Sequence, residues 1–279
     1  MRTLMLACMS LTLAAPAGAG ERGYAPVNGL RLYYEIQGNP AKDGVPLVLL
    51  HGGGSTIETS FGKLIPLVSK ARQVIAFEQQ GHGHTADVDR PFSFDQSAED
   101  AVALLRHLHV AKADFLGYSN GGHIALQIAL AHPEVVRSLV LQSAFFSRDG
   151  TDPQFWQGFD HAKLDDMPLE LRNAYLATAP HPEQLPSFFA KSVQRMRQFH
   201  GWTPAQLKTI RPPTLLIVGD RDIVRVEHAA QMQHLLPDAR LAVLPATDHL
   251  AMTGRAADVA MMLDEFLPRA PTAIRDSRR

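Results

Sequence analysis

The chain is 279 residues long, 46% hydrophobic and 20% charged, and its 27 lysines and arginines against 28 aspartates and glutamates give a formal net charge of −1. This apolar content excludes a disordered or fibrous protein, and the balanced charge provides no field to hold phosphates, so nucleic acid is not expected as a partner. The single cysteine, Cys8, excludes disulfides, cysteine-rich zinc sites and thiol catalysis from the body of the chain.

Residues 1–19 are typical of a secretory signal peptide. Arg2 precedes an apolar run over Leu4–Leu13, and the small residues Ala17–Ala19 complete an A-x-A cleavage pattern. The run is too short to span a membrane, and no later segment approaches the required length of about 20 apolar residues. We therefore expect cleavage after Ala19 and an exported chain, periplasmic or secreted, without a membrane span. A retained N-terminal helix and a lipid anchor on Cys8 stay open as alternatives.

The following residues alternate between strand-like and helix-like segments. Asn28-Gly29, between two extended segments of residues 25–36, predicts a β-hairpin. Continuous apolar runs then predict strands that are buried on both faces, as in a parallel sheet. The predicted strands are Val45–Leu50, Val74–Phe77, Ala113–Tyr118, Ser138–Leu141, Thr214–Val218 and Arg240–Leu244, and the predicted helices are Ala98–Leu108, Gly121–Ala131, Val226–Leu236 and Ala256–Leu267. This alternation predicts an α/β fold: a mostly parallel central sheet with helices on both faces.

Residues 145–211 interrupt the alternation. They carry no strand-like run, two helical patterns at Glu170–Ala177 and Pro186–Phe199, and half of the chain's aromatic residues. Long insertions in α/β domains are usually lids or binding loops, so we expect a helical cap over a substrate. The alternative is a helical subdomain that packs its own aromatic rings. The expected domains are thus the signal peptide (1–19), an α/β core (20–144 and 212–279) and the helical cap (145–211).

A candidate nucleophile lies between a predicted strand and a predicted helix. Gly117-Tyr118-Ser119-Asn120-Gly121 matches G-x-S-x-G, a turn so tight that only glycine two residues to either side of the serine lets the strand and helix approach. The turn also places Ser119 at a helix N-terminus, where free N–H groups favour negative charge.

A serine needs a base, normally a histidine that is oriented by a buried carboxylate. The candidates follow two later predicted strands, where Asp222 comes shortly after one and His249 after the next. Since the carboxyl ends of parallel strands meet at one edge of the sheet, we expect Ser119, Asp222 and His249 to gather there. We prefer Asp222 to Asp220, which is better placed to hold the turn, and we interpret Asp248 as a loop residue.

A glycine-rich turn follows the first predicted parallel strand, at His51-Gly52-Gly53-Gly54. Acyl transfer needs two backbone donors for the oxyanion, one of them from the residue after the nucleophile. We expect these donors to be the N–H groups of Gly53 and Asn120. A phosphate-binding loop is the alternative, but the nucleotide-binding patterns are absent from the sequence.

Together these motifs resemble the α/β-hydrolase superfamily, and the resemblance covers nearly everything after residue 23. It implies Ser119, Asp222 and His249 as nucleophile, acid and base, with Gly53 and Asn120 as the oxyanion hole. The family's loop after its second parallel strand commonly reads D-x-R-G-x-G-x-S, whereas residues 78–85 here read E-Q-Q-G-H-G-H-T, which keeps the glycines but departs from the charge pattern. Capped esterases, lactonases and C–C-bond hydrolases are the most similar branches, and the motifs do not select among them.

The other histidines receive structural interpretations. We expect His51 to brace the oxyanion loop, and we interpret His82 and His84 as residues of a solvated loop, not as metal ligands, because no third ligand is evident. No metal and no cofactor are expected. His123 is interpreted as a structural helix residue.

The leading hypothesis is a serine hydrolase that cleaves a carboxylic ester or a lactone through an acyl-enzyme. Its partner would be a small, apolar ester or lactone. The same residues are compatible with C–C bond hydrolysis or cofactor-free perhydrolysis. A non-catalytic receptor for a small ligand is the alternative from another class.

Overall fold

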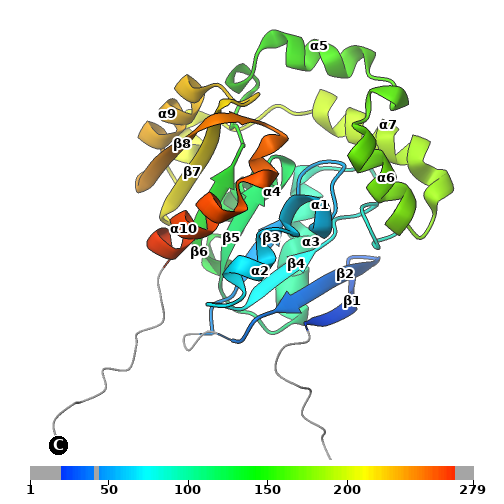
Figure 1. The fold of residues 1–279 in the computed structure, drawn as a ribbon, viewed down its shortest axis with the longest axis horizontal. Coiled ribbons are helices and arrows are strands. Elements are labelled where there is room, and N and C mark those ends of the chain that lie inside the picture. The colour runs from blue at the N-terminus through cyan, green and yellow to red at the C-terminus, as the bar shows by residue number, and fades with distance from the viewer. Residues whose placement is uncertain (1–19, 41–43, 268–279) are drawn as a thin grey trace, which may run out of the picture.

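The structure is a computed structural model that describes residues 20–40 and 44–267. The predicted signal peptide, including Cys8, lies outside the described residues. The core is a sheet with strand order β1-β2-β4-β3-β5-β6-β7-β8 (Figure 1). Its strands are β1 (Glu21–Val27), β2 (Leu30–Gln37), β3 (Leu47–Leu50), β4 (Val74–Phe77), β5 (Ala113–Tyr118), β6 (Val136–Gln142), β7 (Thr214–Arg221) and β8 (Ala239–Asp248). From β4 to β8 all neighbours in this order are parallel, which confirms the predicted α/β class.

The edge of the sheet begins with the predicted hairpin. β1 and β2 pair antiparallel around Asn28 and Gly29, whose φ angles of 47° and 83° are both positive. Two positive φ angles define the type I′ turn, whose twist suits adjacent strands and which asparagine and glycine adopt most easily.

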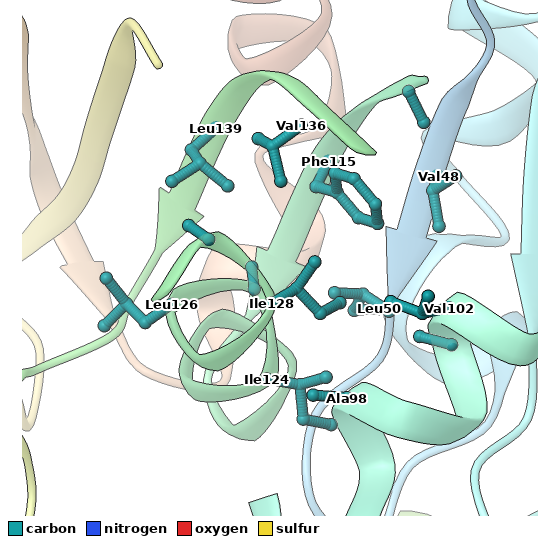
Figure 2. Packing of buried hydrophobic residues seen from close by; sticks show 14 of the residues in the cluster. Val48, Leu50, Ala98, Val102, Phe115, Ile124, Leu126, Ile128, Val136 and Leu139 are labelled. Carbon is teal, nitrogen blue, oxygen red and sulfur yellow. The ribbon is translucent and has the colours of Figure 1, made fainter. Parts of the chain in front are cut away.

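Helices cover both faces of the sheet. On one face lie α3 (Phe94–His107), α4 (Asn120–Ala131) and α9 (Val226–Leu235), and on the other α1 (Ile57–Phe61), α2 (Ile65–Val68) and α10 (Ala256–Phe266). Successive strand residues point to opposite faces of a sheet. Val48 and Leu50 of β3 therefore pack on the side of α3 and α4 (Figure 2). Leu47 and Leu49 belong to the hydrophobic cluster on the other side, with α1, α2 and α10. The strand is therefore apolar at every position, as its sequence predicted.

Between β6 and β7 the chain forms the helices α5 (Pro153–His161), α6 (Leu169–Thr178), α7 (Leu185–Arg197) and α8 (Pro204–Leu207). Figure 1 shows α5, α6 and α7 grouped above one end of the sheet. Helices α6 and α7 match the two predicted patterns within two residues. Helix α5 was not predicted, because Pro153 and Gly158 obscure its periodicity. None of the helices in the described residues is both long and apolar enough to cross a membrane.

Candidate active site

Ser119 occupies a strained turn between β5 and α4. Its φ of 53° and ψ of −118° lie in a region that side-chain-bearing residues rarely adopt. A Cβ on Gly121 would lie 1.8 Å from the carbonyl oxygen of Leu50, and one on Gly117 would lie 2.2 Å from that of Gly121. The two glycines are therefore required for β3, β5 and α4 to approach closely enough to form this turn.

The predicted base and acid both reach Ser119. His249, which directly follows β8, has its Nε2 3.0 Å from the Ser119 Oγ and its Nδ1 2.7 Å from Oδ1 of Asp222. The Asp222 side chain is fully buried, and that of His249 is 17% exposed. Strand ends 130 residues apart in the sequence thus bring a hydroxyl, an imidazole and a carboxylate into one chain of hydrogen bonds.

The Asp222 carboxylate is stabilised in its charged form. Burial raises its pKa, but the hydrogen bond and charge of His249, a hydrogen bond from the Ser143 hydroxyl and one from the Val224 N–H outweigh burial, so the pKa lies below its ordinary value. A charged carboxylate is what keeps the Nδ1 proton on the histidine. Ser143 follows β6 directly and also has a positive φ, of 54°.

Of the two other candidate carboxylates, Asp220 holds the turn as its sequence context suggested, whereas Asp248 ends a strand and is not the loop residue that we expected. Asp220 Oδ1 accepts a hydrogen bond from the Thr247 N–H at 3.1 Å and so joins the ends of β7 and β8. Asp248, the last residue of β8, accepts from the Ala251 N–H at 2.8 Å. Neither has a hydrogen bond to His249, in contrast to Asp222.

Gly53 and Asn120 lie side by side next to Ser119. A Cβ on Gly53 would come within 2.3 Å of the Asn120 Nδ2, and both residues line the same cavity. In the described part of the chain, neither backbone N–H has a hydrogen-bond acceptor. Two such free donors beside the nucleophile are suited to an oxyanion.

Two buried histidines form hydrogen bonds that hold the loop containing Gly53 in place. His51 Nε2 accepts from the Gln79 N–H at 3.0 Å, which agrees with the predicted bracing role. His82 Nε2 accepts from the Gly54 N–H at 3.3 Å. The interpretation of His82 as a solvated residue was wrong, because its ring is 1% exposed and packs between His51 and Phe188. Burial keeps the pKa of each histidine below its ordinary value, to about 4 for His51, so both are neutral acceptors.

A cavity of about 540 Å³ opens onto Ser119 and His249. Its walls are largely apolar, and the insertion contributes many of them. Of the ten aromatic residues noted in the insertion, five line the cavity: Phe145, Phe155, Phe159, Phe188 and Phe189. Among the others, Trp156 and Phe199 stack with parallel rings 5.8 Å apart, whereas Phe146 stacks on His228 and Tyr175 packs against Phe188. The insertion therefore contributes aromatic rings both to the cavity wall and to packing within the protein, and its role in covering a substrate stays a prediction.

The sheet, the strained serine turn and the histidine and carboxylate at later strand ends define an α/β hydrolase. The sequence profile of the alpha/beta hydrolase fold family matches residues 45–206, and the chain belongs to this family.

Named relatives extend across most of the chain. A 2-hydroxymuconate semialdehyde hydrolase of Pseudomonas sp. (strain CF600) is 29% identical over 82% of this chain and 89% of its own. The human serine hydrolase BPHL is 27% identical over 86% of this chain and 84% of its own. Among solved structures, a meta-cleavage product hydrolase of Pseudomonas fluorescens IP01 superposes with a TM-score of 0.74 at 23% identity, covering 88% of this chain and 97% of its own.

Sequence reasoning did not find every residue of the site. It did not find Ser143, Gln79 or Arg195, of which Ser143 contacts Asp222 and the other two contact each other. Ser143 follows a predicted strand next to that of Ser119, a position that was available as a signal. Arg195 had no such signal, since a basic residue on a helix of alternating polarity is usually at the surface. Within residues 20–40 and 44–267, no group of three histidine, cysteine or acidic side chains is arranged to hold a metal ion.

Proposed function

We propose that the protein is a serine hydrolase in which Ser119 is the nucleophile, His249 the general base and acid, and Asp222 the carboxylate that orients His249. The observation that carries this proposal is the continuous chain of hydrogen bonds Ser119–His249–Asp222, open to a cavity on the serine side. Gly53 and Asn120 supply the oxyanion hole through their backbone N–H groups.

The reaction has two halves. Ser119 Oγ attacks a carbonyl carbon and its proton passes to His249 Nε2, while the N–H groups of Gly53 and Asn120 bind the oxygen that becomes negative. When this intermediate collapses, the leaving group takes the proton from His249 and an acyl group stays on Ser119. Water then attacks the acyl carbon and gives a proton to His249, which returns it to Ser119 as the carboxylic acid departs.

The relatives favour a carbon–carbon bond as the one that breaks. The relative from Pseudomonas sp. is named for hydrolysis of a semialdehyde and matches over most of both chains. With the same site, Ser119 would attack one carbonyl carbon of a 1,3-diketone, and the bond from that carbon to the central carbon would break. The second carbonyl group accepts the electron pair of this bond, so the leaving group is an enolate. His249 then protonates this enolate. We therefore propose C–C bond hydrolysis first, the reaction that the sequence analysis placed second.

Ester or lactone hydrolysis is the second candidate, and the cavity wall favours it. Among the described residues that line the cavity there is no lysine or arginine, and the aromatic and aliphatic side chains of α5, α6 and α7 predominate. Such a wall suits an uncharged, apolar acyl group. An ester needs no group to stabilise an enolate, since its leaving alkoxide takes the proton of His249 directly.

The test uses the purified chain and its Ser119→Ala variant. We expect a fluorophosphonate to label the wild type and not the variant, and turnover to fall by about 1,000-fold or more in the variant. Turnover of 1-phenyl-1,3-butanedione would support C–C hydrolysis, whereas turnover only of p-nitrophenyl butyrate or an aliphatic lactone would support the second candidate. Equal labelling of the variant would overturn the triad, and an unlabelled wild type would favour a non-catalytic receptor.

A further inference from the structure

Arg195 of α7 is a cation buried inside the protein. The residue is 4% exposed, although it lies on a helix whose next arginine, Arg197, is exposed. Its Nη1 donates one long hydrogen bond, of 3.4 Å, to the amide oxygen of Gln79. Its Nε and Nη2 are buried without a hydrogen-bond partner. The rings of Phe92 and Phe94 lie 5.7 and 5.2 Å from the guanidinium carbon and give it further contacts.

No carboxylate of the described residues pairs with this guanidinium. Two other largely buried arginines are paired: Arg72 with Asp264 at 3.1 Å and Arg90 with Asp100 at 2.5 Å. Burying an ion without a counterion carries a large free-energy cost. A charge kept at this cost indicates a function beyond packing.

The guanidinium lies directly behind the two residues of the oxyanion hole. A Cβ on Gly53 would be 3.6 Å from Arg195 Nη2 and 2.3 Å from the Asn120 Nδ2. Gln79, which holds Nη1, also donates a hydrogen bond of 2.8 Å to the carbonyl oxygen of His51, two residues before Gly53. Arg195 itself does not line the cavity. It can therefore act on bound substrate through its field but not by contact.

The other titratable groups around the guanidinium do not compete with its charge. His51, His82 and His123 are fully buried, and burial, aided by the charge of Arg195, lowers the pKa of each; that of His51 falls to about 4 and that of His123 to about 3. They are neutral at pH 7. The positive charge behind the oxyanion hole thus comes from Arg195, with no neighbouring carboxylate to cancel it.

We propose that Arg195 is a positioning residue that makes the oxyanion hole electropositive from behind, so that an uncompensated buried cation stabilises the negative charge formed when Ser119 attacks. The inference rests on the proposed function. Charges separated by several ångströms interact strongly where water is excluded, and a fixed charge needs no reorganisation during the reaction. The effect falls on the transition state, since the substrate carbonyl is neutral before attack.

The test measures acylation of Ser119 in the full chain by p-nitrophenyl butyrate and its phosphonylation by a fluorophosphonate, which loses fluoride, each as a maximal rate and a half-saturating concentration. In Arg195→Met we expect the maximal rate to fall by about 10- to 100-fold, with the half-saturating concentration within about threefold. This loss is smaller than the roughly 100- to 1,000-fold loss on removal of a donor that contacts the oxyanion, because Arg195 acts without contact. Arg195→Lys, which keeps the charge, restores most of the rate. Gln194→Met, a change at an exposed position of the same helix, leaves both quantities unchanged.

A second pair of variants keeps Arg195 and changes its neighbour. Gln79→Glu places a carboxylate beside Nη1 and neutralises the charge, whereas Gln79→Leu loses the same hydrogen bond to His51 without adding charge. The new ion pair with Arg195 would favour the folded state. We nevertheless expect slower acylation in Gln79→Glu than in Gln79→Leu, because the carboxylate cancels the charge of Arg195. A purely structural Arg195 predicts the opposite order.

The outcomes separate this inference from the proposed function. A wild type that is not labelled at Ser119 overturns both. Labelling of the wild type, with Arg195→Met as fast as Arg195→Lys and Gln79→Glu as fast as Gln79→Leu, overturns the role of Arg195 and leaves the nucleophile in place.

Discussion

The hydroxyl of Ser143 donates a hydrogen bond to Oδ2 of Asp222. The other oxygen of this carboxylate, Oδ1, is hydrogen-bonded to Nδ1 of His249. Ser143 stands at the end of β6, between the strands that end at Ser119 and near Asp222. Four neighbouring strand ends, those of β5, β6, β7 and β8, therefore contribute to one chain of hydrogen bonds.

Ser143→Ala is expected to reduce kcat/KM by about tenfold, the effect of losing one hydrogen bond to a charged group. The carboxylate of Asp222 would lose a donor, and its pKa would rise toward the ordinary value. Steady-state kinetics with the best substrate checks this. Ser138→Ala is the matched control, because Ser138 lies on the same strand and donates to Asp114, away from the site. Equal effects of the two changes would remove Ser143 from the site.

Asp222→Asn is expected to lower kcat by about 1,000-fold or more, since an amide favours the wrong tautomer of His249. Asp220→Asn keeps an oxygen that can accept the Thr247 N–H, so its loss should stay below about tenfold. Both variants are compared by kcat and by thermal unfolding. The reverse ranking in kcat would assign the acid to Asp220.

Gly121→Ala is expected to destabilise the fold, because its Cβ would overlap the backbone of β3. Overpacking against a backbone atom costs about 3 kcal/mol or more, which corresponds to a fall in Tm of roughly 10 °C. Gly254→Ala is the control, with no atom within 4 Å of the new Cβ. Differential scanning calorimetry measures both. An unchanged Tm in Gly121→Ala would show that α4 can move away from the sheet.

Stability is expected to fall with acid below pH 6.5. The folded-state pKa of His51 is about 4, because the ring is buried and lies near the charge of Arg195. A depressed pKa means that the unfolded chain binds the proton first, so the stabilisation is complete above the unfolded pKa of about 6.5 and is lost as pH falls toward 4. Urea unfolding at several pH values gives the slope.

His51→Gln tests the contribution of this ring. In the variant, the slope of the unfolding free energy against pH should be smaller by up to about 1.4 kcal/mol per pH unit. This is the contribution of one proton that the unfolded chain binds and the folded chain does not. His123, with a pKa of about 3, contributes in the same direction and stays in place as an internal reference. Identical slopes in wild type and variant between pH 6.5 and 4.5 would mean that His51 is charged in the fold.

Export remains a proposal from the sequence of residues 1–19. Expression in a Gram-negative host should yield a mature chain that starts at Gly20, as read by mass spectrometry of the N-terminal peptide. Ala19→Arg should block cleavage, because the processing enzyme requires a small residue at that position. Recovery of a chain that retains residues 1–19 in the cytoplasmic fraction of the wild type would refute export.

The sequence predicted the parts of the fold that depend on local pattern. Apolar runs mark β3 to β6 because both faces of these strands are buried, and Asn28-Gly29 marks the hairpin because few residues tolerate two positive φ angles. The strand β8 extends to Asp248, four residues past its predicted end, since exposed side chains interrupt its apolar pattern.

The site divides in the same way. Ser119, Asp222 and His249 could be predicted because each follows a recognisable strand, and their ordering is set by the sheet. Ser143 carried the same signal, since it follows a strand next to that of Ser119. The contacts of Arg195 and His82 could not be predicted, because they depend on how distant segments pack, and a charged or polar side chain gives no sign in the sequence that it will be buried.

Helix α7 has a consequence for how such a protein diversifies. It belongs to the insertion between β6 and β7, which lines the cavity, and it also carries the buried cation next to Gly53. Exchanging the insertion for that of another hydrolase would leave Ser119, Asp222 and His249 in place, because all three follow strands of the sheet. Under the proposed role of Arg195, the exchange would alter the turnover rate together with the shape of the cavity, so the two properties would change together.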